Sequence, residues 1–446
     1  MLHRRLIEAW HGSSAGKTTV FLLLISFTSI ALGAVLTILL SRTLGIEQYG
    51  IYIFVFGIVN LLLIPADAGL PTLMTREIVK GRTDQKTSSV TAVILWSLLL
   101  ILILGTVTAT AWFASGMFFP DSRISWNLRL WSIGLLFGFA LLYWVTGIIQ
   151  GFEKPIHYAL PNGIIRQVLF LTILLVSLTY VPLTAEMVMA IHFFAICIAV
   201  LWAASIAMRS IRTGLPDFGN EKPNYQSKDW FRSLLPLSLV KGVGFLNHRV
   251  DIVMIGMLST VVAVGGYGVA LQFSALLLIA QTSINALIGP KIVRAYRTEN
   301  YTYLQKLVSY SVTISSVFAL FFALILVFLG QYFLEFVIGR EFLIAYPIIV
   351  ILVVGQIFSA CSGPTALLLN MTDHEKKSLI TGINAAVLNI ILNLALIPFY
   401  GAIGAAIATS LSLAAIQVQR GYMVRKYIKI KPDIIYALTT GLVGQR

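Results

Sequence analysis

The chain has 446 residues, of which 58% are hydrophobic and 11% are charged, and its mean hydropathy is +0.88. Soluble domains carry about 25% charged residues, so this composition excludes a disordered chain, a soluble α/β enzyme and a disulfide-stapled secreted domain. It leaves a polytopic membrane protein. The net charge of +14 would suggest nucleic-acid binding in a soluble protein, but in a membrane protein it first predicts basic cytoplasmic loops.

Apolar segments long enough to cross a bilayer recur along the whole chain. A helix needs about 20 predominantly apolar residues to cross about 30 Å of hydrocarbon, and about twelve segments meet that length. Their approximate centres lie near Phe27, Phe56, Leu100, Phe139, Leu171, Ile196, Phe245, Leu277, Ala319, Val353, Leu388 and Ala408. A further apolar run at residues 434–444 is too short to span, and it is either a surface-lying end or the stub of another helix.

The basic residues alternate between the gaps that separate these segments. The first gap and every second gap after it are basic, as Lys80, Arg232 and Arg294 illustrate, and the cations of the tail from Arg420 to Lys431 continue the pattern. The cations in the alternate gaps are Arg42, Arg123, Arg129 and Arg340. Because cytoplasmic loops carry an excess of Lys and Arg, both termini are predicted to lie in the cytoplasm.

The longest polar stretch, residues 209–232, divides these segments into two halves with similar sequence features. Tyr49 and Gly50 in the first half correspond to Tyr267 and Gly268 in the second. Halves of about six spans each are typical of parallel repeats related by an axis along the membrane normal. Alternatively, Tyr-Gly marks two unrelated interfacial turns. The predicted parts are a lobe at residues 1–208, a cytoplasmic linker at 209–232, a second lobe at 233–420, and a basic cytoplasmic tail with a truncated apolar end at 421–446.

Three stretches of the sequence resemble a known family of membrane proteins. SRTLGIEQYGIY and ADAGLPTLMTREIVKG resemble the N-terminal part of polysaccharide flippases, and RVDIVMIGML with VGGYGVALQF resembles their seventh and eighth spans. NAAVLNIILNLALIPFYGAIGAAIATSLS resembles their C-terminal part. The chain thus resembles the polysaccharide transporter family, in particular the lipid-linked oligosaccharide (O-antigen unit) flippases. That family belongs to the superfamily of multidrug and toxin extrusion transporters and lipid II flippases.

This resemblance implies an all-α polytopic membrane protein, with two lobes of about six helices around a central cavity that opens alternately to either membrane face. It implies a flippase that moves a polyprenyl-diphosphate-linked oligosaccharide, an O-antigen or related surface polysaccharide unit, to the outer leaflet of the bacterial inner membrane. The expected partners are that glycan, the lipid bilayer, and the polysaccharide polymerase with its chain-length machinery. A monomeric transport unit is expected, and no nucleic-acid partner.

Ionisable residues at the depth of a span are costly, so each is a functional candidate. The seventh span contains Lys241, His248, Arg249 and Asp251 on one broad face, and Arg166 adds a cation in the fifth span. A diphosphate carries two or more negative charges, to which Lys and Arg offer charge-assisted contacts. Lys241, Arg249 and Arg166 are therefore predicted to hold the diphosphate. The alternative is that these cations only stabilise the helix bundle.

Three further residues are predicted to tune that site or to carry a coupling ion: His248, Asp251 and Asp67. Histidine changes its charge near neutral pH, and either a proton or sodium would serve as the coupling ion. No cofactor and no metal centre is predicted. Alternatively, Asp67 caps a broken helix beside a proline and a glycine, and Asp251 pairs with Arg249 or Arg166 to stabilise the bundle.

The remaining polar residues in the spans are weaker candidates. Asn389 and Asn393 either hold helices together or line a cavity for sugars, and His192 is interpreted as a satisfied buried histidine. Cys197 and Cys361 both lie within spans, so neither a disulfide framework nor a metal cluster follows. Because the gaps between spans are too short to fold into a catalytic domain, the chain is predicted not to be an enzyme.

Two rival functions stay open at the level of sequence. A cation-coupled drug exporter of the same superfamily would favour a net-anionic cavity, whereas the candidate residues here are mostly cationic. A membrane polysaccharide polymerase would normally carry a large external loop, but the exterior gaps around Pro120 and Gln331 are short. The flippase is therefore the favoured interpretation.

Overall fold

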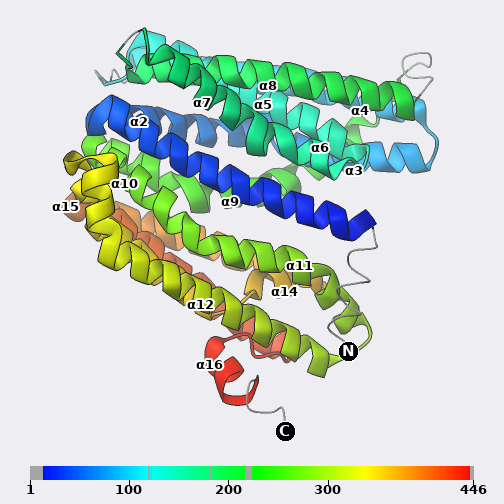
Figure 1. Cartoon of the computed structure of the whole chain (residues 1–446). Coiled ribbons are helices and arrows are strands. Elements are labelled where there is room, and N and C mark those ends of the chain that lie inside the picture. Colours follow the sequence, from blue (N-terminus) through cyan, green and yellow to red (C-terminus); the bar gives the residue numbers. More distant parts are fainter. Residues whose placement is uncertain (1–13, 119–120, 122, 181, 216–222, 442–446) are drawn as a thin grey trace. The chain divides into compact units, whose positions relative to one another are not determined.

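The computed structural model describes residues 14–118, 121, 123–180, 182–215 and 223–441 of the chain. Within these ranges the backbone forms helices joined by short turns, with no strand (Figure 1). The longer helices are α2 (Ser14–Asp67), α3 (Leu70–Thr83), α4 (Thr87–Phe118), α5 (Trp126–Gly151), α7 (Arg166–Ser177), α8 (Ala185–Gly214), α9 (Ser227–Leu258), α10 (Val261–Ser274), α11 (Leu278–Arg297), α12 (Tyr301–Phe333), α13 (Ala345–Cys361) and α15 (Glu375–Met423). The shorter helices are α6 (Pro155–Leu160), α14 (Thr365–Met371) and α16 (Ile434–Tyr436).

Nine helical stretches in the described part of the chain are long and apolar enough to cross a membrane, which confirms a polytopic membrane protein. The longest, α2, has 54 residues, and a straight helix of that length would extend about 80 Å. Its geometry breaks at Gly45 (φ 70°), and α15 breaks in the same way at Gly401 (φ 55°). Glycine adopts such positive φ angles without strain. In both helices the break separates two of the predicted span centres.

The described residues fall into two compact units, and the first is drawn from residues 1–36 and 54–245. In this unit α5 packs closely along α8. A Cβ atom at Gly134 would lie 2.9 Å from the ring of Phe193, and one at Gly138 would lie 2.6 Å from Ile196. Small residues let the backbones of membrane helices approach each other in this way. The α5–α8 pair forms the packed frame on which part of the candidate site is built.

The second compact unit is drawn from residues 37–53 and 246–446, so it includes the middle of α2. That part of α2 packs tightly on α10. A Cβ at Gly50 would lie 1.9 Å from the carbonyl oxygen of Val261, and a Cβ at Gly265 would lie 2.5 Å from that of Ile46. Both Tyr-Gly pairs noted in the sequence therefore lie within packed helices. Their interpretation as an internal repeat stays a prediction.

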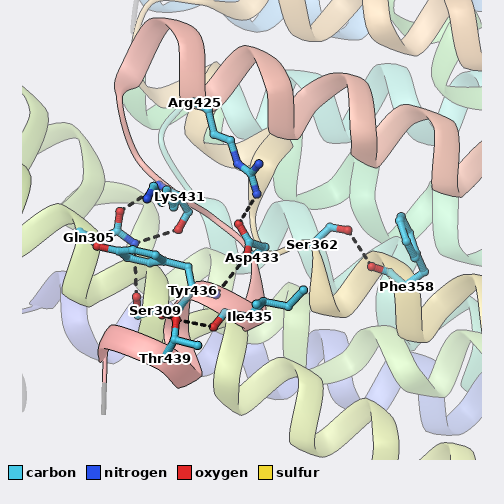
Figure 2. Close-up of polar contacts among 10 residues, drawn as sticks. All are labelled: Gln305, Ser309, Phe358, Ser362, Arg425, Lys431, Asp433, Ile435, Tyr436 and Thr439. Atoms are coloured by element: carbon cyan, nitrogen blue, oxygen red, sulfur yellow. Dashed lines mark hydrogen bonds and ion pairs between the residues drawn. The ribbon is translucent and has the colours of Figure 1, made fainter. Parts of the chain in front are cut away.

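The chain after α15 folds back against α12 (Figure 2). The amide nitrogen Nε2 of Gln305 donates to the carbonyl oxygen of Lys431 at 2.8 Å, and its Oε1 accepts from the Lys431 backbone nitrogen at 2.9 Å. The apolar run at 434–444 was predicted to be a surface-lying end or the stub of another helix. Its residues 434–441 form α16 and a π-helical turn that pack on α12, and residues 442–444 lie outside the described part.

Replacing Gly50 by alanine is expected to destabilise the second unit, because the new Cβ would clash with the carbonyl oxygen of Val261. Such overpacking costs about 1–3 kcal/mol. The apparent melting temperature of the purified protein in detergent should therefore fall. The matched control is Gly421→Ala in α15, where a Cβ would meet nothing within 4 Å. Equal melting temperatures for the two variants would contradict the close packing of α2 on α10.

Candidate functional site

The helix break between α2 and α3 is built around a buried carboxylate. Pro65 lies in the last turn of α2, where its nitrogen has no hydrogen to donate to the preceding turn. Asp67 ends the helix, is fully buried, and accepts a hydrogen bond from the backbone nitrogen of Gly69 at 3.2 Å. Ala68 and Gly69 have φ angles of 44° and 74°. The carboxylate thus fixes an irregular connection that would otherwise leave backbone groups unsatisfied.

Lys241 of α9 forms an ion pair with Asp67 in the first unit. The lysine side chain is 25% exposed and the aspartate 0%, so the pair has one buried and one accessible partner. The Lys241 ammonium also lies 4.9 Å from the ring centroid of Tyr143 and 5.6 Å from that of Phe245. Burying a carboxylate is costly unless it is paired, so the ion pair with Lys241 offsets the cost of burying Asp67. Two of the predicted site residues are therefore in direct contact.

Arg166 forms a second cluster in the first unit, at the start of α7 directly after a π-helical turn. Its Nη1 lies 2.8 Å from Nε2 of His192, and its guanidinium lies 5.3 Å from the ring centroid of Phe139. His192 is 2% exposed and stacks on Phe170 at 4.4 Å. Because arginine can only donate, Nε2 of His192 accepts and the imidazole is neutral. The predicted buried histidine is thus a partner of a predicted site residue.

Asp251 lies in the second unit and is 3% exposed. Its carboxylate accepts three hydrogen bonds: from Tyr267 Oη at 2.9 Å, Thr409 Oγ1 at 2.7 Å and Asn393 Nδ2 at 2.6 Å. The Asn393 amide nitrogen also donates to Asn389 Oδ1 at 2.9 Å. The ion pairs found among the described residues do not include Asp251, although a pairing with Arg249 or Arg166 was one expectation. Hydroxyl and amide groups therefore surround this carboxylate.

The oxygen-rich surroundings of Asp251 suit a small cation or a proton. Oxygen ligands are those that hard cations prefer, and the Oδ1 atom of Asn393 is buried without a hydrogen-bond partner. Among the described residues, no group of three or more His, Cys, Asp or Glu side chains is placed to hold a metal ion. The cluster is able to hold a monovalent ion between carboxylate, amide and hydroxyl oxygens.

The remaining predicted residues are less completely defined. Arg249 is half-buried in α9, within the second unit. His248 lies on the same helix, but its side chain is outside the described part of the structure. Lys241 and Arg166 belong to the first unit and Arg249 to the second. The structure therefore places Asp67 in contact with Lys241, and Arg166 in contact with His192. Arg249 belongs to the other unit.

Sequence reasoning missed two groups of residues near these sites. The hydroxyls of Tyr267 and Thr409 bind Asp251, although hydroxyl side chains in a span carry no distinctive signal. Arg420 was counted as a tail cation, but it lies within α15, where its Nε donates to Thr381 Oγ1 at 3.1 Å. Of the partners of Asp251, only Asn393 stood out in the sequence, because its four-residue spacing from Asn389 places both on one helix face.

A family model described as polysaccharide biosynthesis protein matches residues 15–296, which is more than half of the chain. The chain belongs to this family. A second model, MatE, matches residues 245–395. Membership of this family places the protein among transporters and flippases, which are not enzymes.

One curated relative and two solved structures are similar over most of the chain. The probable low-salt glycan biosynthesis flippase Agl15 of Haloferax volcanii is 25% identical over 399 residues, 88% of this chain and 79% of the relative. An inward-facing MATE-family multidrug resistance transporter has a TM-score of 0.75 at 15% identity, covering 92% of this chain and 98% of the other. The lipid II flippase MurJ, inward closed, has a TM-score of 0.69 at 15% identity, covering 95% and 92%. The fold is therefore that of MATE and MurJ transporters.

Replacing Lys241 by methionine is expected to destabilise the first unit, because Asp67 would keep a buried charge without its partner. Breaking a buried pair from one side costs about 3–5 kcal/mol. The double variant Lys241→Met, Asp67→Asn should recover much of the loss in melting temperature, since it removes both charges. If the double variant melts no higher than Lys241→Met alone, the ion pair is not what stabilises this helix break.

Proposed function

We propose that the protein is a flippase for a polyprenyl-diphosphate-linked oligosaccharide, which it moves from the cytoplasmic to the outer leaflet by alternating access. The observation that carries the proposal is the membership of the polysaccharide biosynthesis family together with cations on the apolar helices α7 and α9. The 25% identity to a probable glycan biosynthesis flippase supports the same substrate class. The finer assignment is an O-antigen or related surface polysaccharide unit.

The diphosphate is assigned to Lys241, Arg249 and Arg166. A bare diphosphate could not cross hydrocarbon, and charge-assisted contacts to Lys and Arg replace the water that it loses. Lys241 is partly exposed while Asp67 is buried, so an incoming phosphate can approach the ammonium from its accessible side. Asp67 then keeps the lysine oriented and charged while the binding site is empty. Before the diphosphate binds, the charge of Lys241 is therefore balanced by Asp67.

Removing Arg166 or Arg249 is expected to slow flipping about tenfold or more, because a hydrogen bond to a charged group contributes about 1.5–3 kcal/mol. The protein is reconstituted in liposomes with a defined polyprenyl-diphosphate glycan, and a glycosidase added outside reports the glycan that reaches the outer leaflet. Arg166→Ala and Arg249→Ala are compared with Arg340→Ala, whose side chain is 83% exposed. Unchanged rates in the first two variants would remove these residues from the diphosphate site.

The coupling role is assigned to Asp251, with His248 and Asp67 as the other candidates. The buried carboxylate has hydroxyl and amide partners, so binding of a proton or a sodium ion would neutralise it and change its hydrogen bonds. Such a group responds to an ion gradient without contacting the glycan. No cofactor is required.

Imposed gradients test this role. Glycan flipping by the wild-type protein should accelerate under either a sodium or a pH gradient, and Asp251→Asn should lose that acceleration because asparagine cannot change its charge. The control is Asp373→Asn, which removes a carboxylate with a 71% exposed side chain. An Asp251→Asn protein that still responds fully to the gradient would exclude Asp251 from coupling.

A cation-coupled exporter of small molecules is the second candidate, and the buried carboxylates of Asp67 and Asp251 favour it, because such an exporter would use anionic groups within its helices. A membrane polysaccharide polymerase is a more remote alternative. Cells that lack the protein should accumulate lipid-linked units on the cytoplasmic leaflet if it is a flippase. Accumulation on the outer leaflet would indicate a polymerase, and unchanged glycan lipids with altered drug tolerance would indicate the exporter.

The proposal includes a membrane topology of about twelve crossings in two lobes of about six helices, with both termini in the cytoplasm of a bacterial cell and the protein in its inner membrane. Twelve crossings rather than the nine counted in the described part of the chain are supported by the breaks at Gly45 and Gly401, which each divide one long helix in two, and by α9, whose charged residues keep it out of the count of nine. The lobes are assigned to residues 1–208 and 233–420, the linker to 209–232 and the tail to 421–446. The transport unit is a monomer, with the polymerase and chain-length machinery as downstream partners.

A further inference from the structure

The segment that follows α15 has a defined structure, although its sequence is typical of a loose basic tail. Gln305 of α12 binds both backbone groups of Lys431, as Figure 2 shows. Gly363, with φ +78°, lies so close to Pro432 that a Cβ would be 2.2 Å from its carbonyl oxygen. Ile428 and Ile430 are 1% and 2% exposed within an apolar cluster of this unit. The segment is therefore an integral part of the second unit.

An ion pair closes the segment on itself. Arg425 Nη2 lies 2.5 Å from Oδ2 of Asp433, and Oδ1 of Asp433 accepts from the backbone nitrogen of Tyr436 at 3.1 Å (Figure 2). Burial alone would raise the pKa of Asp433, but the hydrogen bonds from Arg425 and Tyr436 lower that pKa below its ordinary value. The carboxylate is therefore charged at neutral pH and neutralises Arg425. The ion pairs found among the described residues do not include Lys426, Lys429 or Lys431.

Two lysines, Lys377 and Lys426, lie against the ring of Tyr427. The Lys377 ammonium lies 2.8 Å from the ring centroid of Tyr427, and the Lys426 ammonium lies 5.5 Å from it. The ring of His374 lies against the same tyrosine at 5.5 Å. The acidic groups nearby in sequence are Asp373, which pairs with Arg297 at 3.1 Å, and the exposed Glu375. Two ammonium groups and a phenol thus converge at a half-exposed position.

The same segment exposes apolar side chains next to further cations. Ile435 of α16 and Leu438 of the π-helical turn that follows it are 72% and 52% exposed. Lys429 and Lys431 are exposed, and the Lys431 ammonium lies 4.8 Å from the ring centroid of Tyr436. Lysine, tyrosine and exposed aliphatic residues in one short helical segment are typical of a surface that lies at a membrane interface.

We propose that residues 424–441, together with Lys377, form a binding surface for membrane lipids whose headgroups carry a net negative charge. The Lys377–Tyr427–Lys426 cluster binds the headgroup phosphate, and Ile435 and Leu438 enter the interface beside it. Clusters of basic residues at the cytoplasmic end of membrane helices attract anionic lipids in this way, and the aliphatic residues favour a lipid over a soluble phosphate. The surface belongs to the cytoplasmic side in the topology proposed above, but its lipid binding does not depend on the transported cargo.

The test is a lipid titration of the full-length protein in detergent, with the melting temperature as the readout. Phosphatidylglycerol should raise the melting temperature of the wild-type protein, whereas phosphatidylcholine should have little effect. In Lys377→Gln, Lys426→Gln the concentration of phosphatidylglycerol needed for half of the shift should increase about fivefold or more, since two charge-assisted contacts are lost. The matched control is Lys80→Gln, Lys86→Gln, which removes two lysines that are 62% and 63% exposed in the first unit.

Two further experiments distinguish a lipid headgroup from a soluble phosphate as the bound group. Ile435→Ser, Leu438→Ser should weaken the effect of phosphatidylglycerol while leaving the melting temperature without added lipid unchanged, because both side chains are exposed. Inorganic pyrophosphate, which carries the charge of the cargo headgroup without a lipid chain, should not reproduce the shift. The proposal is wrong if pyrophosphate stabilises the protein as well as phosphatidylglycerol does. It is also wrong if phosphatidylglycerol raises the melting temperature of the lysine variant and of the Ile435, Leu438 variant at the same concentrations as for the wild type.

Discussion

The cost of placing charge inside apolar helices governs the arrangement of this protein. Each charged group in the candidate sites with defined contacts lies beside a group that compensates it. Asp67 has Lys241, Arg166 has the neutral imidazole of His192, and Asp251 has hydroxyl and amide donors. These pairings differ in one functional respect. A lysine held by a buried carboxylate keeps its positive charge, whereas a carboxylate held by neutral donors has a charge that a bound ion can still remove.

The helix breaks have a second role in the same arrangement. Pro65, Ala68 and Gly69 interrupt the helix so that Asp67 sits at a terminus, where its carboxylate satisfies backbone nitrogen as well as the lysine. The hydroxyl of Ser238 on α9 donates a hydrogen bond to the carbonyl oxygen of Ala68, which ties the helix that carries Lys241 to the break. Irregular backbone within a membrane protein is tolerated only where such partners exist. The break and the ion pair therefore stabilise each other.

The sequence was sufficient to predict the helical membrane fold, the family and the helix α9 as the carrier of ionisable residues, because composition and the cost of buried charge need no knowledge of packing. It did not predict which residues would meet. Asp67 and Lys241 are 174 residues apart, and Asp251 and Thr409 are 158 apart. The Thr409 hydroxyl oxygen also lies 2.9 Å from the carbonyl oxygen of Ala405 one turn earlier, as is common for threonines in apolar helices, so its contact with Asp251 leaves no mark in the sequence.

The division of the chain into units has a consequence for how the protein can be made. Residues 37–53 pack in the second unit although they stand near the N-terminus, and residues 227–245 of α9 cluster with the first although they follow the polar linker. A gene split at that linker would yield an N-terminal fragment that carries part of the other unit's core and a C-terminal fragment that lacks it. Neither fragment contains a complete unit, so the two halves of this sequence are not interchangeable modules, and the second unit is complete only when residues 37–53 are present.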